Sequence, residues 1–153
     1  IIIDFVLKHL KEKDYSGSLI LMGRSLGSVS VLELAKRYPK DFSGLIIESG
    51  FADEEPLFAL IGTSAEQEGF KKEDGFLNGE KIKEYMGPLL IIHEEQDHIV
   101  PFSQGQLLYN SCSSKKKTFI PIPNANHNNI LGVSFQKYFE EVEKFINLSS
   151  GRF

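Results

Sequence analysis

The stretch LILMGRSLGSVSVLELA, residues 19–35, decides the fold. An apolar run of strand length leads straight into GRSLG, residues 23–27, and an apolar helical pattern begins at once on the far side. A serine at the apex of such a tight corner is forced toward a strained backbone conformation. We expect Gly23 and Gly27 to let the strand and the helix pass without side-chain collision. The corner would then project the Ser25 hydroxyl beyond the strand, at the N-terminus of a helix.

Three further apolar runs of strand length follow, at residues 44–48, 88–93 and 116–122. Continuously apolar strands that alternate with helices indicate a parallel sheet covered on both faces. We therefore predict an α/β fold, a three-layer sandwich with a mainly parallel sheet of about four strands. The first strand is expected at residues 18–22, and helices at residues 25–37, 56–61, 79–85, 103–110 and 135–147.

The opening residues form an amphipathic helical pattern that ends before Gly17. The pattern already resembles the middle of a helix and no methionine precedes it, so we expect further chain before residue 1. The 153 residues suit one domain, residues 1–153, in which residues 51–86 form a small lid-like insertion. The polar, glycine-containing composition of this insertion separates it from the apolar strands around it.

Composition and charge narrow the choice of partners. The chain is 41% hydrophobic and 25% charged, with a net charge of −4, which favours a small or neutral ligand over nucleic acid. Its apolar runs are too short to cross a bilayer, and no signal-like segment opens it, so we expect a cytoplasmic protein without membrane contact. The single cysteine, Cys112, fits a reducing compartment and is expected to be a packing residue.

Polar side chains follow three of the four predicted strands. Ligands of an open parallel sheet bind beyond the carboxyl ends of its strands. Ser25 follows the first strand, Asp97 the third and His127 the fourth. The bare G-x-S-x-G pattern arises by chance in about one chain in twenty of this length. Its place at a strand-to-helix corner, with an acid and a histidine at later strand ends, favours a nucleophile with its acid and base.

Other residues compete for these roles. His98 adjoins Asp97, but neighbouring side chains on an extended segment point apart, which favours His127 as the base. Glu94 and Glu95 could replace Asp97 as the acid. His93 lies within an apolar strand and is expected to be packed and hydrogen-bonded.

Two further interpretations concern ions. The segment HEEQDH, residues 93–98, follows a strand and lacks the H-E-x-x-H spacing on a helix, so we expect no metal site there. Arg24 and Glu48 lie near strand ends and could form a structural ion pair.

These motifs resemble the α/β-hydrolase family over essentially the whole chain, as the C-terminal half of that fold. GRSLG looks like the nucleophile elbow, LLIIHEEQDHIVP (residues 89–101) like the strand and turn that carry the acid, and IPNANHNN (residues 122–129) like the histidine loop. GLIIESGFAD, residues 44–53, is similar to an esterase-like or serine-aminopeptidase-like branch. Glu94 and Asn126 stand where the family usually has glycine, and asparagine tolerates the left-handed backbone that glycine adopts there.

The resemblance implies a serine hydrolase that cleaves an ester, thioester or amide of a small-molecule or short-peptide acyl substrate. Ser25 would be the nucleophile, His127 the base and Asp97 the acid, while the Leu26 backbone N–H would stabilise the oxyanion without metal or organic cofactor. The alternative is a catalytically inactive binding or interaction module that keeps the elbow as architecture.

The resemblance also implies about four more strands before the opening helix, together with the loop that carries the second oxyanion donor. Residues 18–22 would then be an open sheet edge. We expect that edge to be covered, by a second copy of the chain in a homodimer or by a displaced opening helix.

Overall fold

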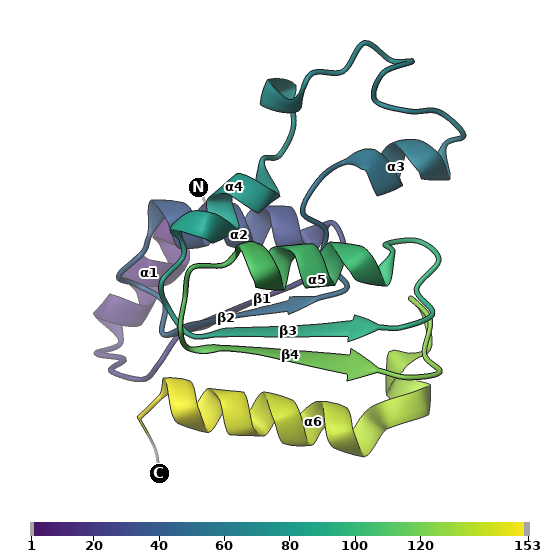
Figure 1. Cartoon of the computed structure of the whole chain (residues 1–153). Helices are drawn as coiled ribbons and strands as arrows, with labels where there is room; N and C mark the ends of the chain where they lie inside the picture. The colour runs from purple at the N-terminus through teal and green to yellow at the C-terminus, as the bar shows by residue number, and fades with distance from the viewer. Residues whose placement is uncertain (1, 152–153) are drawn as a thin grey trace.

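The computed structural model describes residues 2–151 and places a four-stranded parallel sheet between layers of helices (Figure 1). This architecture confirms the predicted α/β sandwich. The strands lie in the order β1-β2-β3-β4, and they are β1 (Ile20–Arg24), β2 (Gly44–Glu48), β3 (Leu89–Glu94) and β4 (Lys117–Ile122). The helices are α1 (Ile2–Glu12), α2 (Gly27–Arg37), α3 (Glu55–Leu60), α4 (Asn78–Glu84), α5 (Phe102–Ser111) and α6 (Ile130–Ser149), with a 3₁₀ turn η1 (Lys72–Asp74).

The two faces of the sheet are covered by different helices. Every residue of β2 and β3 is buried, as continuously apolar strands predict. Because successive strand side chains alternate between faces, Leu45 and Ile47 pack in one core with α2, α4 and α5, whereas Ile46 packs in the other with α6. Figure 1 shows α6 alone on its side of the sheet. The sheet is therefore packed on both faces by apolar side chains.

The last helix differs most from its predicted bounds. It begins at Ile130 rather than at residue 135, and Ser134 interrupts it with non-helical angles, φ −141° and ψ 38°. The helical spacing of apolar residues begins anew after this kink. The sequence pattern therefore predicted only the longer segment of the helix, which follows Ser134. The short segment before the kink carries the chain directly away from the loop that contains His127.

The segment between β2 and β3 projects beyond the helical layer through α3 and η1 (Figure 1). Its aromatic side chains pack on one another, with the Phe58 and Phe70 rings 5.0 Å apart between centroids. The following helix, α4, returns to the layer, where Ile82 is fully buried. The projecting part thus ends before α4, and a lid function for it stays a prediction.

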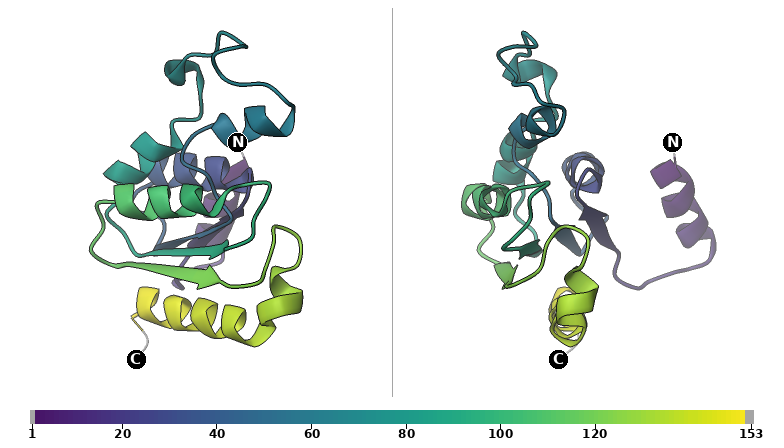
Figure 2. Two further views of the ribbon diagram at one scale, coloured as in Figure 1. Left: turned by 45° about the vertical axis from the view of Figure 1, so that its right-hand side comes forward. Right: turned by 90° about the vertical axis from the view of Figure 1, so that its right-hand side faces the viewer.

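Strand β1 lies at an edge of the sheet and pairs with β2 alone among the described strands. Met22 on this strand is 48% exposed. The opening helix α1 stands apart from the sheet (Figure 2) and has no buried residue, so it does not cover the edge. Closure of the edge by a second copy stays a prediction, which light scattering can test. Across residues 2–151, no helix has the length and apolar character that crossing a membrane requires.

Candidate active site

Ser25 occupies a left-handed corner between β1 and α2. Its φ is +51°, a conformation that a non-glycine residue adopts rarely and at an energetic cost. Two backbone hydrogen bonds hold the corner: the Ser25 N–H donates to the Glu48 carbonyl at 2.9 Å, and the Ser28 N–H donates to the Ser25 carbonyl at 3.0 Å. The strained serine predicted from the sequence is therefore present, tied to the end of the neighbouring strand.

The two glycines of the corner differ in their surroundings. A Cβ at Gly23 would lie 2.5 Å from the Gly27 carbonyl oxygen and 2.8 Å from Val31 Cγ2, so this position excludes any side chain. A Cβ at Gly27 would meet nothing within 4 Å. The expectation that both glycines prevent a collision is wrong for Gly27, because α2 starts there and its side-chain direction faces open space.

Asp97 lies three residues beyond β3 and is 7% exposed. One carboxylate oxygen, Oδ1, accepts hydrogen bonds from the backbone N–H groups of Ile99 at 2.9 Å and Val100 at 2.8 Å. These bonds fix the plane of the carboxylate and leave Oδ2 free to accept another donor. The turn thus holds Asp97 as an oriented acceptor.

His127 supplies that donor from the loop after β4. Its Nδ1 lies 2.7 Å from Asp97 Oδ2, and the imidazole is 5% exposed. Since a carboxylate can only accept, Nδ1 carries the proton and Nε2 of the neutral ring has a lone pair available. The contact joins residues 30 positions apart, at the same end of the sheet.

The Ser25 corner and the His127 loop are linked by the side chain of Arg24. Within residues 2–151, the Ser25 hydroxyl makes no hydrogen bond to the imidazole. Instead Arg24, the residue before Ser25, donates from Nη2 to the backbone oxygen of His127. The structure therefore brings Asp97 and His127 into direct contact, and it connects the serine corner to the histidine loop by one side chain.

The Leu26 backbone N–H lies at the start of α2, where the helix dipole favours negative charge. Leu26 has helical angles, φ −58° and ψ −26°, and its carbonyl accepts from the Val29 N–H at 3.1 Å. The Leu26 N–H shares its peptide plane with the Ser25 carbonyl, so the hydrogen bond that this carbonyl accepts from the Ser28 N–H at 3.0 Å fixes the direction of the amide. This position suits a donor to an oxyanion formed at Ser25.

The competing residues lie elsewhere or have other partners. His98 and Glu95 are exposed. Glu94 is fully buried, but its Oε2 accepts from the Ser49 hydroxyl at 2.5 Å rather than from an imidazole. His93 is buried, and its Nε2 is 2.9 Å from the Val100 carbonyl oxygen, as a packed histidine would be. Burial lowers the pKa of His93, which keeps this ring neutral.

Three buried residues near the end of β3 offer atoms that could bind a metal ion. One such atom from each of His93, Glu94 and Asp97 lies within 4.8 Å of the others. Both Asp97 oxygens already accept hydrogen bonds, however, one from backbone amides and the other from His127. A cation at this place would compete with the Asp97–His127 hydrogen bond.

A network around Glu48 was only partly visible in the sequence. The suspected ion pair is present, with Arg24 Nε 2.8 Å from Glu48 Oε1. The other carboxylate oxygen accepts from the Tyr138 hydroxyl at 2.6 Å, a residue of α6 that sequence reasoning missed. The sequence did offer one signal for this network, because Glu48 ends an otherwise apolar strand. A buried carboxylate at such a position requires hydrogen-bond or ion-pair partners.

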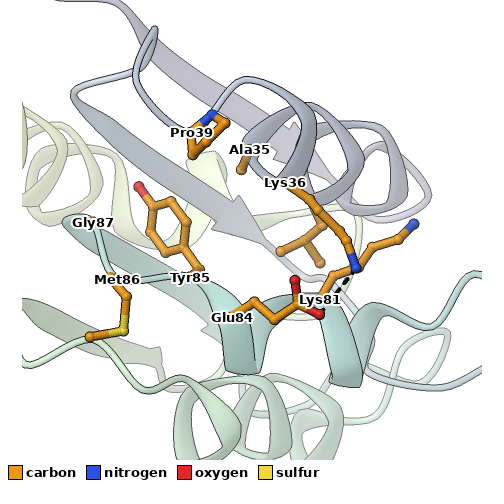
Figure 3. A pocket seen from close by; sticks show the side chains of 9 residues that line it. Ala35, Lys36, Pro39, Lys81, Glu84, Tyr85, Met86 and Gly87 are labelled. Atoms are coloured by element: carbon orange, nitrogen blue, oxygen red, sulfur yellow. Dashed lines mark hydrogen bonds and ion pairs between the residues drawn. The ribbon is translucent and has the colours of Figure 1, made fainter.

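A separate pocket lies at the opposite end of the strands (Figure 3). Its volume is about 310 Å³. It includes Pro39, Met86 and Gly87, which precede β2 and β3, and Lys36 forms an ion pair with Glu84 at its rim, 3.0 Å long. None of the candidate catalytic residues lines this pocket.

Comparisons with known proteins agree with this fold. No family model matches the chain. It is 29% identical over 133 residues to the alpha/beta hydrolase domain-containing protein 17C of Xenopus tropicalis, a match that covers 85% of this chain and 39% of that protein. The chain thus spans about two fifths of the length of the curated relatives it matches.

Two solved structures share the architecture at low sequence identity. A monoacylglycerol lipase of Paleococcus ferrophilus aligns with a TM-score of 0.70 and 18% identity, over 95% of this chain and 73% of the lipase. An esterase domain of a Rhodothermus marinus protein aligns with a TM-score of 0.66 and 18% identity, over 90% of this chain and 64% of that domain. The chain is thus similar to curated alpha/beta hydrolase domain-containing proteins, and it shares the α/β-hydrolase fold of the two solved structures.

Proposed function

We propose that this chain carries the nucleophile, base and acid of a serine hydrolase that works through an acyl-enzyme. The observation that carries the proposal is the 2.7 Å hydrogen bond between the buried His127 and Asp97 side chains. It orients an imidazole at the end of the sheet where Ser25 sits in a left-handed corner. A histidine held by a carboxylate at the same sheet end as a half-buried serine corner is the arrangement that activates a hydroxyl nucleophile.

In the proposed reaction the Ser25 oxygen attacks the substrate carbonyl while His127 Nε2 takes the hydroxyl proton. The imidazolium then returns this proton to the leaving alcohol, thiol or amine as the tetrahedral intermediate collapses to the acyl-enzyme. Water attacks the acyl carbonyl in the second half, again with His127 as the base, and Ser25 regains its proton. Asp97 remains ionised throughout, holding the tautomer and stabilising the imidazolium.

The Leu26 N–H is proposed as one oxyanion donor, supported by its place at the start of α2. Family resemblance puts the second donor on a loop of the preceding half of the fold. Removing one such donor typically costs about 10² to 10³ in kcat. We therefore propose that full activity belongs to the full-length protein, and that residues 1–153 alone are a poor catalyst.

We propose a carboxylic ester as the substrate class. The lipase and esterase titles of the two structural neighbours support this choice, although at 18% identity their fold alone is comparable. The aminopeptidase alternative requires recognition of a free amino group. A direct comparison of p-nitrophenyl acyl esters with aminoacyl p-nitroanilides distinguishes the two, and faster turnover of the anilides would overturn the ester assignment.

Ser25→Ala in the full-length protein tests the nucleophile. We expect turnover of a p-nitrophenyl ester to fall by up to about 10⁶, as in other enzymes with this triad, and labelling by a fluorophosphonate to disappear. Ser28→Ala, which changes a buried serine in the first turn of α2, is the matched control for labelling. Retention of more than a tenth of the activity in Ser25→Ala would contradict the assignment. A wild-type protein that is neither labelled nor active would favour the binding module.

A further inference from the structure

Arg24 makes a two-armed contact at the corner that carries Ser25. Its Nε donates to Glu48 Oε1 at 2.8 Å, and its Nη2 donates to the backbone oxygen of His127. The planar guanidinium holds these two donors in a fixed relation, which a flexible ammonium could not do. One side chain therefore joins the residue next to the candidate nucleophile with the main chain of the candidate base, 103 residues later.

Glu48 holds the Arg24 guanidinium in place through their hydrogen bond. It is the last residue of β2 and is 5% exposed, and both of its carboxylate oxygens are used, one by Arg24 and one by the Tyr138 hydroxyl. Burial and the hydrogen bond to Glu48 both raise the pKa of Tyr138, so this hydroxyl stays protonated and continues to donate. A network in which every buried polar atom has a partner is rigid, and this one spans β1, β2 and α6.

The histidine loop has its own internal bonds on either side of His127. The Asn126 N–H donates to Asn129 Oδ1 at 2.7 Å, and the Asn128 N–H donates to Asn126 Oδ1 at 3.0 Å. Ahead of them, the Ala125 carbonyl accepts from the Gln96 N–H at 3.0 Å. These contacts shape the loop and tie it to the turn that carries Asp97. Among residues 2–151, the hydrogen bond from Arg24 Nη2 to the His127 carbonyl ties this loop to the corner of Ser25.

We propose that Arg24, held by Glu48 and Tyr138, is a positioning residue that fixes the main chain of His127 relative to Ser25. The inference rests on the proposed function, because its catalytic consequence requires His127 to act on Ser25. Among the described residues, Arg24 makes no hydrogen bond to the imidazole or to the Ser25 hydroxyl. Its effect on the rate would come from geometry, since a displacement of about 1 Å between reacting groups can cost about 10² in rate.

A structural ion pair is the competing explanation, and the two differ in what a variant loses. A purely structural pair would reduce the amount of folded protein and leave turnover per folded site unchanged. A positioning role predicts that Arg24→Ala lowers kcat by about 10- to 100-fold per site, with KM nearly constant. Titration with a fluorophosphonate counts the folded sites in each preparation.

Chemical rescue provides the sharpest readout. Beside Arg24 and Glu48 there is a cavity of about 430 Å³, lined also by Asn128, Ile130 and Leu131. In Arg24→Ala this cavity would admit free guanidinium, which can pair with Glu48 and donate to the His127 carbonyl. We expect guanidinium chloride, far below denaturing concentration, to restore part of kcat, and sodium chloride at equal ionic strength to restore none. Arg37→Ala removes a surface arginine paired with Glu33 and should show neither the loss nor the rescue.

A second measurement separates this proposal from the proposed function. The downfield proton resonance of His127 Nδ1–H reports its bond to Asp97 without requiring turnover. We expect the resonance to broaden or shift in Arg24→Ala and to return with guanidinium, even if Ser25→Ala shows that the activity lies elsewhere. If Arg24→Ala does not fold, Arg24→Lys and Glu48→Gln carry the same two readouts with smaller losses. An unchanged resonance together with an unchanged kcat per site would overturn the positioning role.

Discussion

The polar side chains discussed at the two ends of the parallel sheet differ in their burial and in their partners. At the carboxyl ends of the strands, buried groups pair over long sequence separations: Asp97 with His127, and Glu48 with Arg24 and Tyr138. At the amino ends, the pocket in Figure 3 is bordered by Lys36 and Glu84, an ion pair whose side chains are 47% and 61% exposed.

The difference shows which polar groups the fold holds in fixed positions. A buried carboxylate costs free energy unless its partners are well placed, so the carboxyl ends tolerate little change. An exposed pair is screened by water and contributes little. Substitutions at the two ends should therefore differ by orders of magnitude in activity and by several-fold in stability.

After Ser25→Ala, Asp97→Asn is expected to have the largest effect at the carboxyl ends. The amide can hold the imidazole in place, but it favours the wrong tautomer, so kcat should fall by about 10⁴ in the full-length enzyme. The bonds that Ile99 and Val100 donate to Oδ1 can persist, and the melting temperature should change little. Glu95→Gln changes an exposed neighbour and is the control. Loss of activity in Glu95→Gln with a near-normal Asp97→Asn would move the acid.

Gly23→Ala against Gly27→Ala compares two glycines of one corner. The Cβ at position 23 would clash with the Gly27 carbonyl and the Val31 side chain. Overpacking of this kind lowers the free energy of unfolding by about 1–3 kcal/mol. The Cβ at position 27 meets open space at a helix start, so the free energy of unfolding should stay the same or rise by a few tenths of a kcal/mol, about the helix preference of alanine. Urea titration of both variants measures the contrast. Equal destabilisation would mean that the corner packs differently.

Much of the arrangement at the carboxyl ends of the strands could be predicted from the sequence. Apolar runs that alternate with helical patterns define a parallel sheet, and a parallel sheet gathers all its carboxyl ends at one edge. Ser25, Asp97 and His127 each follow a strand, so their approach to one another needs no knowledge of packing. The contact of Asp97 with His127 agrees with this reasoning.

Other features depend on packing that periodicity does not encode. The partner of Glu48 on α6 is set by the rotation of that helix, which places Tyr138 toward the sheet. The kink at Ser134 divides α6 into two helical segments whose apolar patterns are out of register. The apolar periodicity of the sequence across the kink therefore does not reveal where the first segment begins. The direction that a Cβ at Gly27 would take follows from where α2 begins, and apolar periodicity does not define the first residue of a helix.

His93 gives the carboxyl ends a pH dependence in the mildly acidic range. Burial lowers its pKa below the ordinary value of about 6.5. In the acidic range the unfolded chain binds a proton here that the folded chain does not, so this contribution to stability is complete above about pH 6.5 and declines as the pH falls. The urea midpoint of the wild type should drop more between about pH 7 and pH 5 than that of His93→Gln. The exposed His98→Gln should keep the wild-type slope; a slope in His93→Gln as steep as the wild type would contradict the assignment.

Lys36→Ala should have the smallest effect, because it removes one partner of the exposed pair at the amino ends. The ammonium lies 3.0 Å from Glu84 Oε1, but the Glu84 side chain is 61% exposed and stays in water after the change, so no buried charge is left without a partner. The free energy of unfolding should change by less than about 0.5 kcal/mol, and the small difference should shrink further in high salt. Ester turnover should be unaffected, since the pocket contains none of the candidate catalytic residues. A large loss of activity in Lys36→Ala would instead mean that the two ends of the sheet communicate, and the contrast drawn between them would not hold.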